Sequence, residues 1–386
     1  MAGEQRTDFK RKIGIIGGGA SGLAAAIAAA SQNFSCEVTI FERLGRVGKK
    51  LLATGNGRCN ISNRFCDDSR YHGENPSFMV PAMKQFDRKS TEDFFFQMGL
   101  MMVEQEDGKY YPRSLQASSV LDVLRMEAER LSVKTICDCE ITDILPQKAG
   151  FLLKSNEESF FVDFVIVSAG GPASPQLGGT NSGFCLLEKL GHQLTPLYPS
   201  IVQLKTDVST IKPLSGIKID GKVQLLGGKE VQYGEILFTD YGISGPPVLQ
   251  ISGAVSRRLA TGQKPVFVTL DLAPNEEEQM LTEILQKRVS AHPYRTLDDF
   301  FVGMLPKRLG QCVMKAVGFT PLSREAATLT AKDSEKICRQ LKNWRLEVKD
   351  TNGFRNAQVT AGGINTTDFY ADTMESKKVS GLYACG

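Results

Sequence analysis

The sequence lacks the cysteine and histidine spacings that bind metals or form redox-active disulfides. It has three histidines and nine cysteines, but neither a C-x-x-C nor an H-x-x-x-H pattern occurs. Structural zinc sites and the dithiols of disulfide reductases use such spacings, so we expect neither a metal centre nor a redox-active cysteine pair. An odd number of scattered cysteines also argues against a secreted disulfide framework and favours a reducing, cytoplasmic environment.

The sequence also has little net charge. Lys and Arg number 46 and Asp and Glu number 43, which leaves a formal net charge of +3. A chain so nearly balanced is not predicted to bind nucleic acid through bulk attraction, although a local basic patch stays open. We therefore expect a small-molecule substrate and no nucleic-acid partner.

A long hydrophobic run is missing as well. Residues 13–36 carry no charge and follow three basic residues, an arrangement that resembles a signal peptide or a short membrane span. Glycines, which favour turns, dilute the hydrophobicity of this stretch, so we predict neither secretion nor membrane insertion. These glycines are Gly14, Gly17, Gly18, Gly19 and Gly22.

The sequence does contain a strand–helix–strand unit near its start. Residues 12–16 form an apolar run typical of a buried parallel strand, and the Ala-rich segment 20–30 favours a helix packed closely on a sheet. Residues 37–41 predict a second strand, which completes a βαβ unit. A further buried strand is expected at 164–167, and the length of 386 residues suggests two or three domains.

A G-x-G-x-x-G motif joins the first strand to the helix. Gly17 permits a tight turn, Gly19 lets a pyrophosphate approach the backbone, and Gly22 lets helix and sheet pack closely. Glu42 follows at the end of the second strand, where it would accept hydrogen bonds from ribose hydroxyls and disfavour a 2′-phosphate. The motif therefore predicts FAD or NAD rather than NADP, held by Gly17, Gly18, Gly19, Ala20, Ser21, Gly22 and Glu42.

A Gly-rich, basic loop over 44–63 favours FAD, because a long ligand needs contacts beyond the first turn. The basic residues at 43, 46, 49, 50, 58 and 64 could instead contact RNA, but FAD phosphates explain several of them more simply. Cys59 is either a plain buried cysteine or a reactive thiol. The candidate FAD contacts in this region are Arg43, Lys49, Lys50, Thr54, Gly55, Asn56, Gly57, Arg58, Cys59 and Asn60.

Three later segments also offer backbone to a nucleotide. They are Ser168-Ala-Gly-Gly171, which directly follows a predicted buried strand, Gly362-Gly363, and Gly381-Leu-Tyr-Ala-Cys-Gly386. No second strand–GxGxxG–helix unit exists, so no separate NAD(P)H domain is predicted. The remaining candidate contacts are Ile141, Ala169, Gly170, Gly171, Gly362, Gly363 and Gly386.

Several motifs together resemble one family, the bacterial FAD-dependent oxidoreductases typified by aminoacetone oxidase and the dehydro-bile-acid reductase. The motifs span almost the whole chain in order. They are IIGGGASGLA at 15–24, KLLATGNGRCNISN at 50–63, YPRSLQASS at 111–119, SAGGPASP at 168–175, FTDYGISGP at 238–246, VTAGGI at 359–364 and TMES at 373–376.

The resemblance implies an α/β fold with three parts. A Rossmann-like FAD-binding domain (glutathione-reductase-like βαβ) is expected over 1–195 plus 355–386. A β-barrel-like insert domain is expected over 196–273 plus 325–354, and a small helical domain over 274–324. In members of this family, an acidic residue, a Gly-rich turn and a helix usually follow the position of Gly386 and finish the flavin site.

The resemblance also implies an FAD-dependent enzyme whose substrate stays open. The flavin would accept hydride at N5 and pass electrons to oxygen or to a small organic substrate. The alternatives are an NAD(P)H-dependent reductase of an enone-type substrate, with NAD(P)H as a transient donor, and a flavin-binding protein without catalysis. No catalytic residue is assigned, and the candidates for a catalytic base are His72, His192 and Tyr241.

Overall fold

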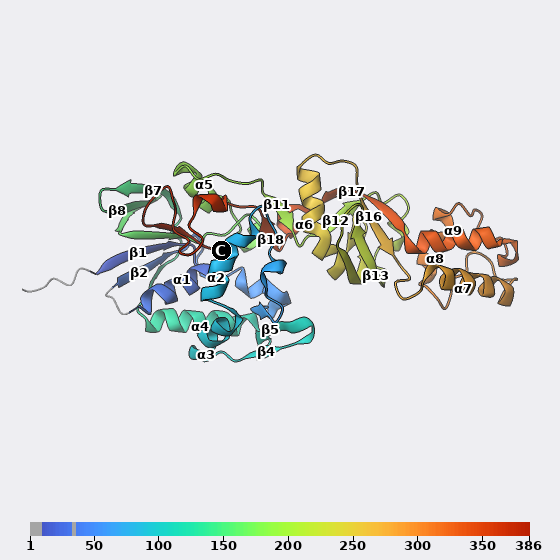
Figure 1. Cartoon of the computed structure of the whole chain (residues 1–386), viewed down its shortest axis with the longest axis horizontal. Coiled ribbons are helices and arrows are strands. Elements are labelled where there is room, and N and C mark those ends of the chain that lie inside the picture. Colours follow the sequence, from blue (N-terminus) through green and yellow to red (C-terminus); the bar gives the residue numbers. More distant parts are fainter. Residues whose placement is uncertain (1–9, 33–35) are drawn as a thin grey trace, which may run out of the picture. The chain divides into compact units, whose positions relative to one another are not determined.

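The computed structural model describes residues 10–32 and 36–386. These residues form two compact units (Figure 1). The first contains the described residues up to Leu197 together with Gly362–Gly386, and the second is Tyr198–Ala361. The opening nine residues of the expected FAD domain lie outside the described residues. Among the described residues, no helix is both long enough and apolar enough to cross a membrane.

The first unit is built on a five-stranded parallel sheet with the order β19-β10-β1-β2-β6. The chain runs outward from the central strand β1 to β2 and β6 on one side, and later adds β10 and β19 on the other. The carboxyl end of β1 is therefore the point where the strand order reverses, which is where open α/β sheets bind ligands. The strands are β1 Arg11–Ile16, β2 Cys36–Phe41, β6 Lys134–Ile136, β10 Phe164–Val167 and β19 Leu382–Ala384.

Both faces of this sheet are covered. Ile15 of β1 packs in a core with helices α1 (Ala20–Ala30) and α4 (Ala117–Arg130). The next residue, Ile16, packs in a second core with an antiparallel three-stranded sheet and with helix α5 (Ser182–Lys189). Successive side chains of a strand point to opposite faces, so an uninterrupted apolar run can serve both cores. The small sheet consists of β7 Ile141–Gln147, β8 Gly150–Ser155 and β9 Ser159–Val162.

A peripheral layer follows the loop after β2. It contains helices α2 (Val80–Gln85) and α3 (Arg88–Gln97) and a small antiparallel sheet. The strands of that sheet are β3 Ser62–Asn63, β4 Met102–Glu104 and β5 Lys109–Pro112. Phe94 and Phe95 of α3 pack against the core formed by α1 and α4, which ties this layer to the main sheet.

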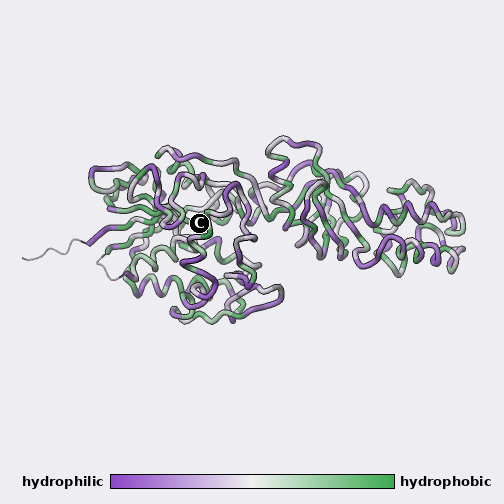
Figure 2. The backbone as a smooth tube through the Cα atoms, in the orientation of Figure 1, coloured by the Kyte–Doolittle hydropathy of each residue, from purple (hydrophilic) through white to green (hydrophobic). Residues whose placement is uncertain are grey.

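The second unit contains a closed six-stranded antiparallel barrel with the order β12-β15-β14-β13-β16-β17. Strands β13 and β14 form an antiparallel hairpin, in which they pair from Lys218 opposite Leu237 to Gln224 opposite Val231. In Figure 2, hydrophobic and hydrophilic stretches alternate along these strands. They are β12 Leu204–Thr206, β13 Lys218–Leu225, β14 Val231–Phe238, β15 Gly242–Ser244, β16 Val266–Asp271 and β17 Trp344–Thr351.

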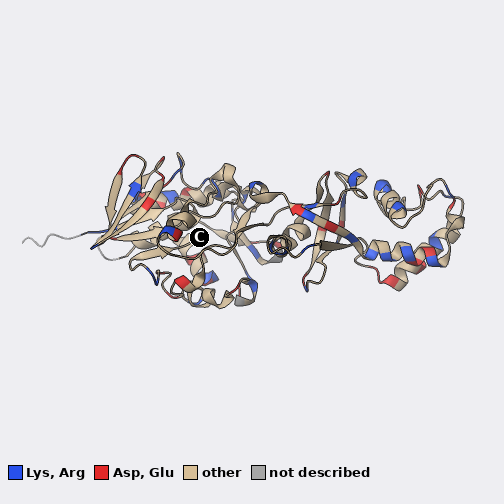
Figure 3. Ribbon diagram, turned by 90° about the horizontal axis from the view of Figure 1, so that it is seen from above, with Lys and Arg blue, Asp and Glu red and all other residues tan. Residues whose placement is uncertain are grey.

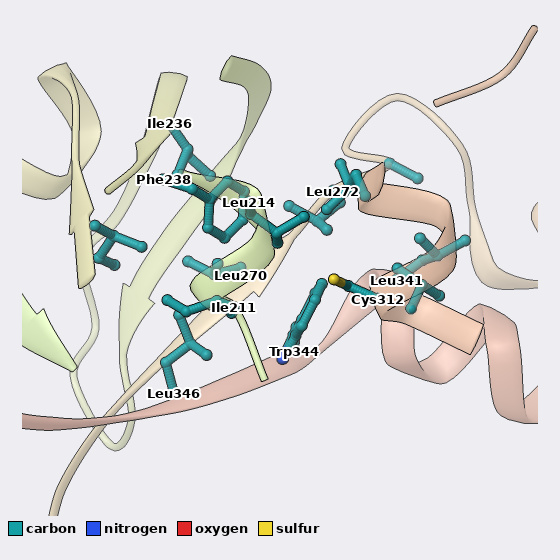
Figure 4. Packing of buried hydrophobic residues seen from close by; sticks show 14 of the residues in the cluster. Ile211, Leu214, Ile236, Phe238, Leu270, Leu272, Cys312, Leu341, Trp344 and Leu346 are labelled. Atoms are coloured by element: carbon teal, nitrogen blue, oxygen red, sulfur yellow. The ribbon is translucent and has the colours of Figure 1, made fainter. Parts of the chain in front are cut away.

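Four helices of ten or more residues accompany the barrel, and one hydrophobic core runs through the barrel strands and these helices. Figure 4 shows Phe238 of β14 and Trp344 of β17 in this core, together with Cys312 and Leu341 from the helices. The division of this unit into a β-rich and a helical domain therefore stays a prediction. The helices are α6 Pro246–Ala260, α7 Glu278–Ala291, α8 Lys307–Ala316 and α9 Ala331–Lys342.

The chain re-enters the first unit at Gly362. Just before this point, β18 (Val359–Ala361) lies antiparallel to β11 (Tyr198–Ser200). This pairing keeps the outgoing and returning segments together up to the boundary. A short helix, α10 (Gly353–Asn356), precedes β18.

The sole tryptophan allows the stability of the barrel unit to be measured separately. Phe238 is fully buried, and its ring centroid lies 6.3 Å from that of Trp344. We predict that Phe238→Ala lowers the free energy of unfolding of this unit by about 3–5 kcal/mol, because the substitution leaves a cavity in a packed core. The measurement is the urea midpoint of tryptophan fluorescence. Phe96→Ala is the control, since that side chain is 68% exposed and belongs to the first unit. An unchanged midpoint for Phe238→Ala would contradict the packing described.

Candidate functional site

A cavity of about 550 Å³ lies in the first unit at the carboxyl ends of the parallel strands. Its size falls within the range of small-molecule and cofactor sites. The last residue of β1, Ile16, and the last residue of β2, Phe41, both line it. The predicted residues that line it are Gly17, Gly18, Gly19, Ala20, Ser21, Glu42, Arg43, Lys49, Lys50, Thr54, Cys59, Asn60, Ile141, Ala169, Gly170 and Gly386.

The glycines of the turn after β1 have different surroundings. Gly17 adopts a φ of 108°, and a Cβ on it would lie 2.6 Å from the carbonyl oxygen of Ser168. A Cβ on Gly22 would lie 1.9 Å from the carbonyl oxygen of Gly17, so this glycine allows α1 to pack against the turn. A Cβ on Gly19 would meet no atom within 4 Å. Gly19 therefore borders the open space of the cavity, whereas Gly17 and Gly22 shape the backbone.

The N-terminus of α1 has no side chain that caps it. Its N-cap is Gly19, and no acidic residue lies in its first turn. The first backbone N–H groups of a helix lack intrahelical partners, and the helix dipole adds positive potential at this end. An exposed helix start beside a cavity is therefore suited to an anionic ligand group such as a phosphate.

Glu42 joins two walls of the cavity. Its Oε2 accepts a hydrogen bond of 2.7 Å from the backbone N–H of Gly18, and its Oε1 accepts one of 2.8 Å from that of Leu44. The backbone N–H of Gly48 also donates to the carbonyl oxygen of Gly18 at 2.8 Å. Each carboxylate oxygen has a further lone pair, so Glu42 can still accept a hydrogen bond from a ligand hydroxyl.

The loop after β2 supplies most of the charge around the cavity. Lys50 is partly buried, its Nζ lies 3.4 Å from the carbonyl oxygen of Gly171, and it makes no ion pair with any described residue. Burial lowers the pKa of the Lys50 ammonium. The Nε of Arg43 lies 3.9 Å from the Oε1 of Glu140. Four cationic side chains and two carboxylates line the cavity, namely Arg43, Arg46, Lys49, Lys50, Glu42 and Glu140.

The rest of this loop has an unusual backbone that sets its shape. Thr54 is extended with a ψ of 150°, and Gly55 and Asn56 have positive φ. The Thr54 hydroxyl donates to the carbonyl oxygen of Leu51, and the guanidinium of Arg58 lies 4.8 Å from the centre of the Tyr111 ring. Thr54 lines the cavity. Arg58 does not line it, because its guanidinium is held against the ring of Tyr111.

Eight predicted contacts do not line the cavity. Gly22 lies where helix α1 packs against the turn after β1. The carbonyl oxygen of Gly171 lies 3.4 Å from the Nζ of Lys50, which lines the cavity. Gly363 bonds with Thr195, which holds the outgoing and returning chains together: the Thr195 N–H donates to the Gly363 carbonyl oxygen at 2.8 Å. These eight residues are Gly22, Gly55, Asn56, Gly57, Arg58, Gly171, Gly362 and Gly363.

Sequence reasoning also missed residues that line the cavity. The Ser168 hydroxyl lies 2.9 Å from the carbonyl oxygen of Gly17 and braces the turn, and its position in the SAGG motif could have revealed it. Helices α3 and α4 contribute an apolar wall that only the tertiary structure brings to the site. The missed residues include Leu44, Gly48, Phe95, Val120, Leu124, Glu140, Ser168, Thr180 and Ser182.

None of the three candidates for a catalytic base lines this cavity. His192 is buried, and its ring stacks on Phe369. Its Nδ1 lies 2.9 Å from the Leu187 carbonyl oxygen, which only accepts, so Nδ1 carries the hydrogen. Its Nε2 then accepts from the Ser376 hydroxyl at 2.8 Å. His192 is therefore a structural histidine.

The sequence profile described as the HI0933-like protein Rossmann domain matches residues 11–386. The chain belongs to this family. The Rossmann-like sheet and the fingerprint turn after β1 agree with that assignment, and so the predicted fold class is confirmed. In the part of the chain that the structure describes, no group of three or more His, Cys, Asp or Glu is placed to hold a metal ion.

Two curated proteins and one solved structure show what this HI0933-like chain resembles. The 3-dehydro-bile acid delta(4,6)-reductase of Clostridium scindens is 40% identical over 97% of this chain and 92% of its own length. The ribosomal RNA dihydrouridine synthase of Haemophilus influenzae is 30% identical over 96% and 90%. The 3-ketosteroid-delta4-(5alpha)-dehydrogenase of Rhodococcus jostii is 13% identical over 100% and 92%, with a TM-score of 0.43. The family and the reductase relative support an oxidoreductase function.

The cysteines near the cavity of this HI0933-like chain are predicted to be unreactive. Burial raises the pKa of the Cys59 thiol, and it raises the pKa of Cys385 to about 11. At pH 8 roughly one Cys385 thiol in a thousand is then the nucleophilic thiolate. We expect iodoacetamide at pH 8 to label the exposed Cys66 and Cys185 but not Cys59 or Cys385, as read by peptide mass spectrometry. Rapid labelling of Cys59 would instead support a reactive thiol.

Proposed function

We propose that this chain is an FAD-dependent reductase that adds two hydrogens across a carbon–carbon double bond conjugated with a carbonyl group. The observation that carries the proposal is the cavity at the carboxyl end of β1, in a chain 40% identical to a delta(4,6)-reductase. An oxidase that passes electrons to oxygen uses the same cofactor, but neither curated relative reported above is named as one.

The residues around the cavity fit FAD. The four cations and two carboxylates that line it leave a charge of +2, which matches the two negative charges of a pyrophosphate. The uncapped start of α1 and the open space at Gly19 are suited to that same group. Lys50 is partly buried without a carboxylate among the described residues, so an anionic ligand would compensate its charge. Glu42 would accept hydrogen bonds from the ribose.

Each part of the chain then has a distinct task. FAD, when bound, supplies a group that accepts and donates hydride. The turn at Gly17–Gly22 and the loop cations would orient it, and the apolar side chains of Phe95, Val120 and Leu124 would exclude water from their part of the cavity. The substrate gains one hydride and one proton in total, and NAD(P)H, which loses the hydride, is the proposed donor.

The names of the two curated relatives describe chemically similar reactions. A 3-dehydro-bile acid with a Δ4 double bond is an enone, because the double bond is conjugated with the 3-oxo group. Dihydrouridine differs from uridine by two hydrogens on the C5–C6 double bond, which is conjugated with the C4 carbonyl. Hydride addition to the β-carbon of a conjugated carbonyl would account for either overall change, and we propose this step for this chain.

The cofactor assignment predicts a specific effect of a small substitution at Gly19. Gly19→Ala adds one methyl group in the space where the pyrophosphate would approach, without a clash inside the protein. We expect the variant to fold normally and to bind FAD at least about tenfold more weakly, a loss of about 1.4 kcal/mol. The measurement is quenching of FAD fluorescence in a titration, with circular dichroism as the folding check.

Gly45→Ala is the matched control. Gly45 lies in the neighbouring loop after β2, does not line the cavity, and has space for a Cβ at 3.4 Å from the Asp138 carboxylate. It should bind FAD as the unmodified protein does. Equal FAD affinity in all three proteins would contradict the proposed position of the pyrophosphate.

The reaction itself is tested with the FAD-loaded protein under anaerobic conditions. We expect NADPH or NADH to bleach the flavin absorbance and a simple enone, 2-cyclohexen-1-one, to restore it with formation of the saturated ketone. Restoration by oxygen but not by the enone would favour the oxidase. Protein that binds no added FAD would overturn the proposal.

A further inference from the structure

The near balance of charge over the whole chain conceals a strongly basic segment. Residues 305–345 contain nine Lys and Arg and three Asp and Glu, a net charge of +6, compared with +3 for the whole chain. This segment contains α8, α9 and the start of β17, all in the second unit. Figure 3 shows Lys and Arg side by side along helices of this region.

Helix α9 presents this charge on one face. Lys332, Lys336 and Arg339 are exposed and recur every three or four residues, the spacing that places side chains on one side of a helix. Gln340 and Asn343 continue the same face. The opposite face is buried in the core of the unit through Ser334, Ile337, Cys338 and Leu341.

A hollow of about 540 Å³ lies beside the C-terminal half of this basic face. Its polar lining consists of three cations, two amides and one carboxylate: Lys336, Arg339, Arg345, Gln340, Asn343 and Glu278. We call this surface the α9 groove. It lies entirely within the second unit and is separate from the cavity described above.

The cations of the α9 groove are available to an external ligand. The closest carboxylates lie at 3.8 Å from Lys336 and 3.7 Å from Arg339, and both cationic side chains are more than half exposed. Arg345 is exposed and makes no ion pair with any described residue. Weak, exposed pairs of this kind contribute little to stability, so folding alone does not account for this concentration of charge.

The composition of the groove favours RNA over other polyanions. Lys and Arg neutralise phosphates, and Arg binds a phosphate through two parallel hydrogen bonds. Gln and Asn side chains offer both donors and acceptors, which suit 2′-hydroxyls and base edges. An anionic membrane surface would favour several apolar side chains beside the cations, but Val317 is the one apolar residue in the lining of this groove, beside two amides and a carboxylate.

We propose that the α9 groove binds the phosphate backbone of an RNA, and that the conjugated carbonyl reduced by this chain is the uracil ring of a uridine in that RNA. The second part rests on the proposed function, and the first does not. The 30% identity to a ribosomal RNA dihydrouridine synthase agrees with this substrate class.

The test compares two double variants of the full chain saturated with FAD. Lys336→Gln with Arg339→Gln removes two charges from the groove. Lys205→Gln with Lys229→Gln removes two exposed charges from strand β12 and from the turn between β13 and β14 of the same unit. The probe is a fluorescein-labelled single-stranded RNA rich in uridine, measured by fluorescence anisotropy over a range of salt concentrations.

For the groove variant we expect the Kd for RNA to rise about tenfold at moderate salt. We also expect the slope of log Kd against log salt to fall by about 1.4, because each phosphate contact in a single strand contributes about 0.7. The control variant should bind as the unmodified protein does. Equal RNA binding by the two variants would overturn the proposal. So would RNA-independent binding to phosphatidylglycerol vesicles that depends on Lys336 and Arg339, because a membrane would then be the partner.

The two parts of the proposal fail in different ways. Reduction of 2-cyclohexen-1-one without groove-dependent RNA binding would overturn the RNA partner and leave the reductase intact. Groove-dependent RNA binding by a protein that reduces neither the enone nor uridine in RNA would support the groove and overturn the proposed function. Dihydrouridine formed in the RNA probe with NADPH, detected by mass spectrometry, would support both.

Discussion

The carboxylate of Glu42 is the contact on which the geometry of the cavity most depends. It accepts the backbone N–H groups of Gly18 and Leu44, and so it joins the turn after β1 to the loop after β2. A buried N–H left without an acceptor costs about 1–3 kcal/mol, which makes any other arrangement of the two loops unfavourable. Since α1 begins directly after this turn, the same contact orients the uncapped start of the helix beside the cavity.

The C-terminal part of the chain contributes to the same site. Strand β19 pairs in parallel with β10, and Gly386 after it lines the cavity. The whole second unit is inserted between the two parts of the first, and the two crossing segments are held together by Thr195 and Gly363. Gly362 permits the close crossing, because a Cβ on it would lie 2.2 Å from the carbonyl oxygen of Pro196. The paired glycines therefore belong to the junction rather than to the cavity wall.

Charge in this protein is organised locally in two places. The residues that line the cavity and those that line the α9 groove each include two more cations than carboxylates, while the whole chain has a net charge of only +3. For ligand binding, the local distribution of charged side chains matters more than the net charge of the chain, because salt screens charges beyond about 8–10 Å under ordinary conditions. A ligand therefore meets only the charges of the surface it contacts.

The sequence alone determined the βαβ unit, the fingerprint turn and the buried strand at 164–167, because hydrophobic period and glycine positions are local properties. The predicted helix at 20–30 coincides with α1 for the same reason. Only the tertiary structure decided that Phe95 and Val120 line the cavity while Arg58 and Gly363 do not, and that His192 is locked to Ser376. It also decided that Lys336, Arg339 and Arg345 share one groove. These outcomes depend on contacts between residues far apart in the chain, which no local pattern specifies.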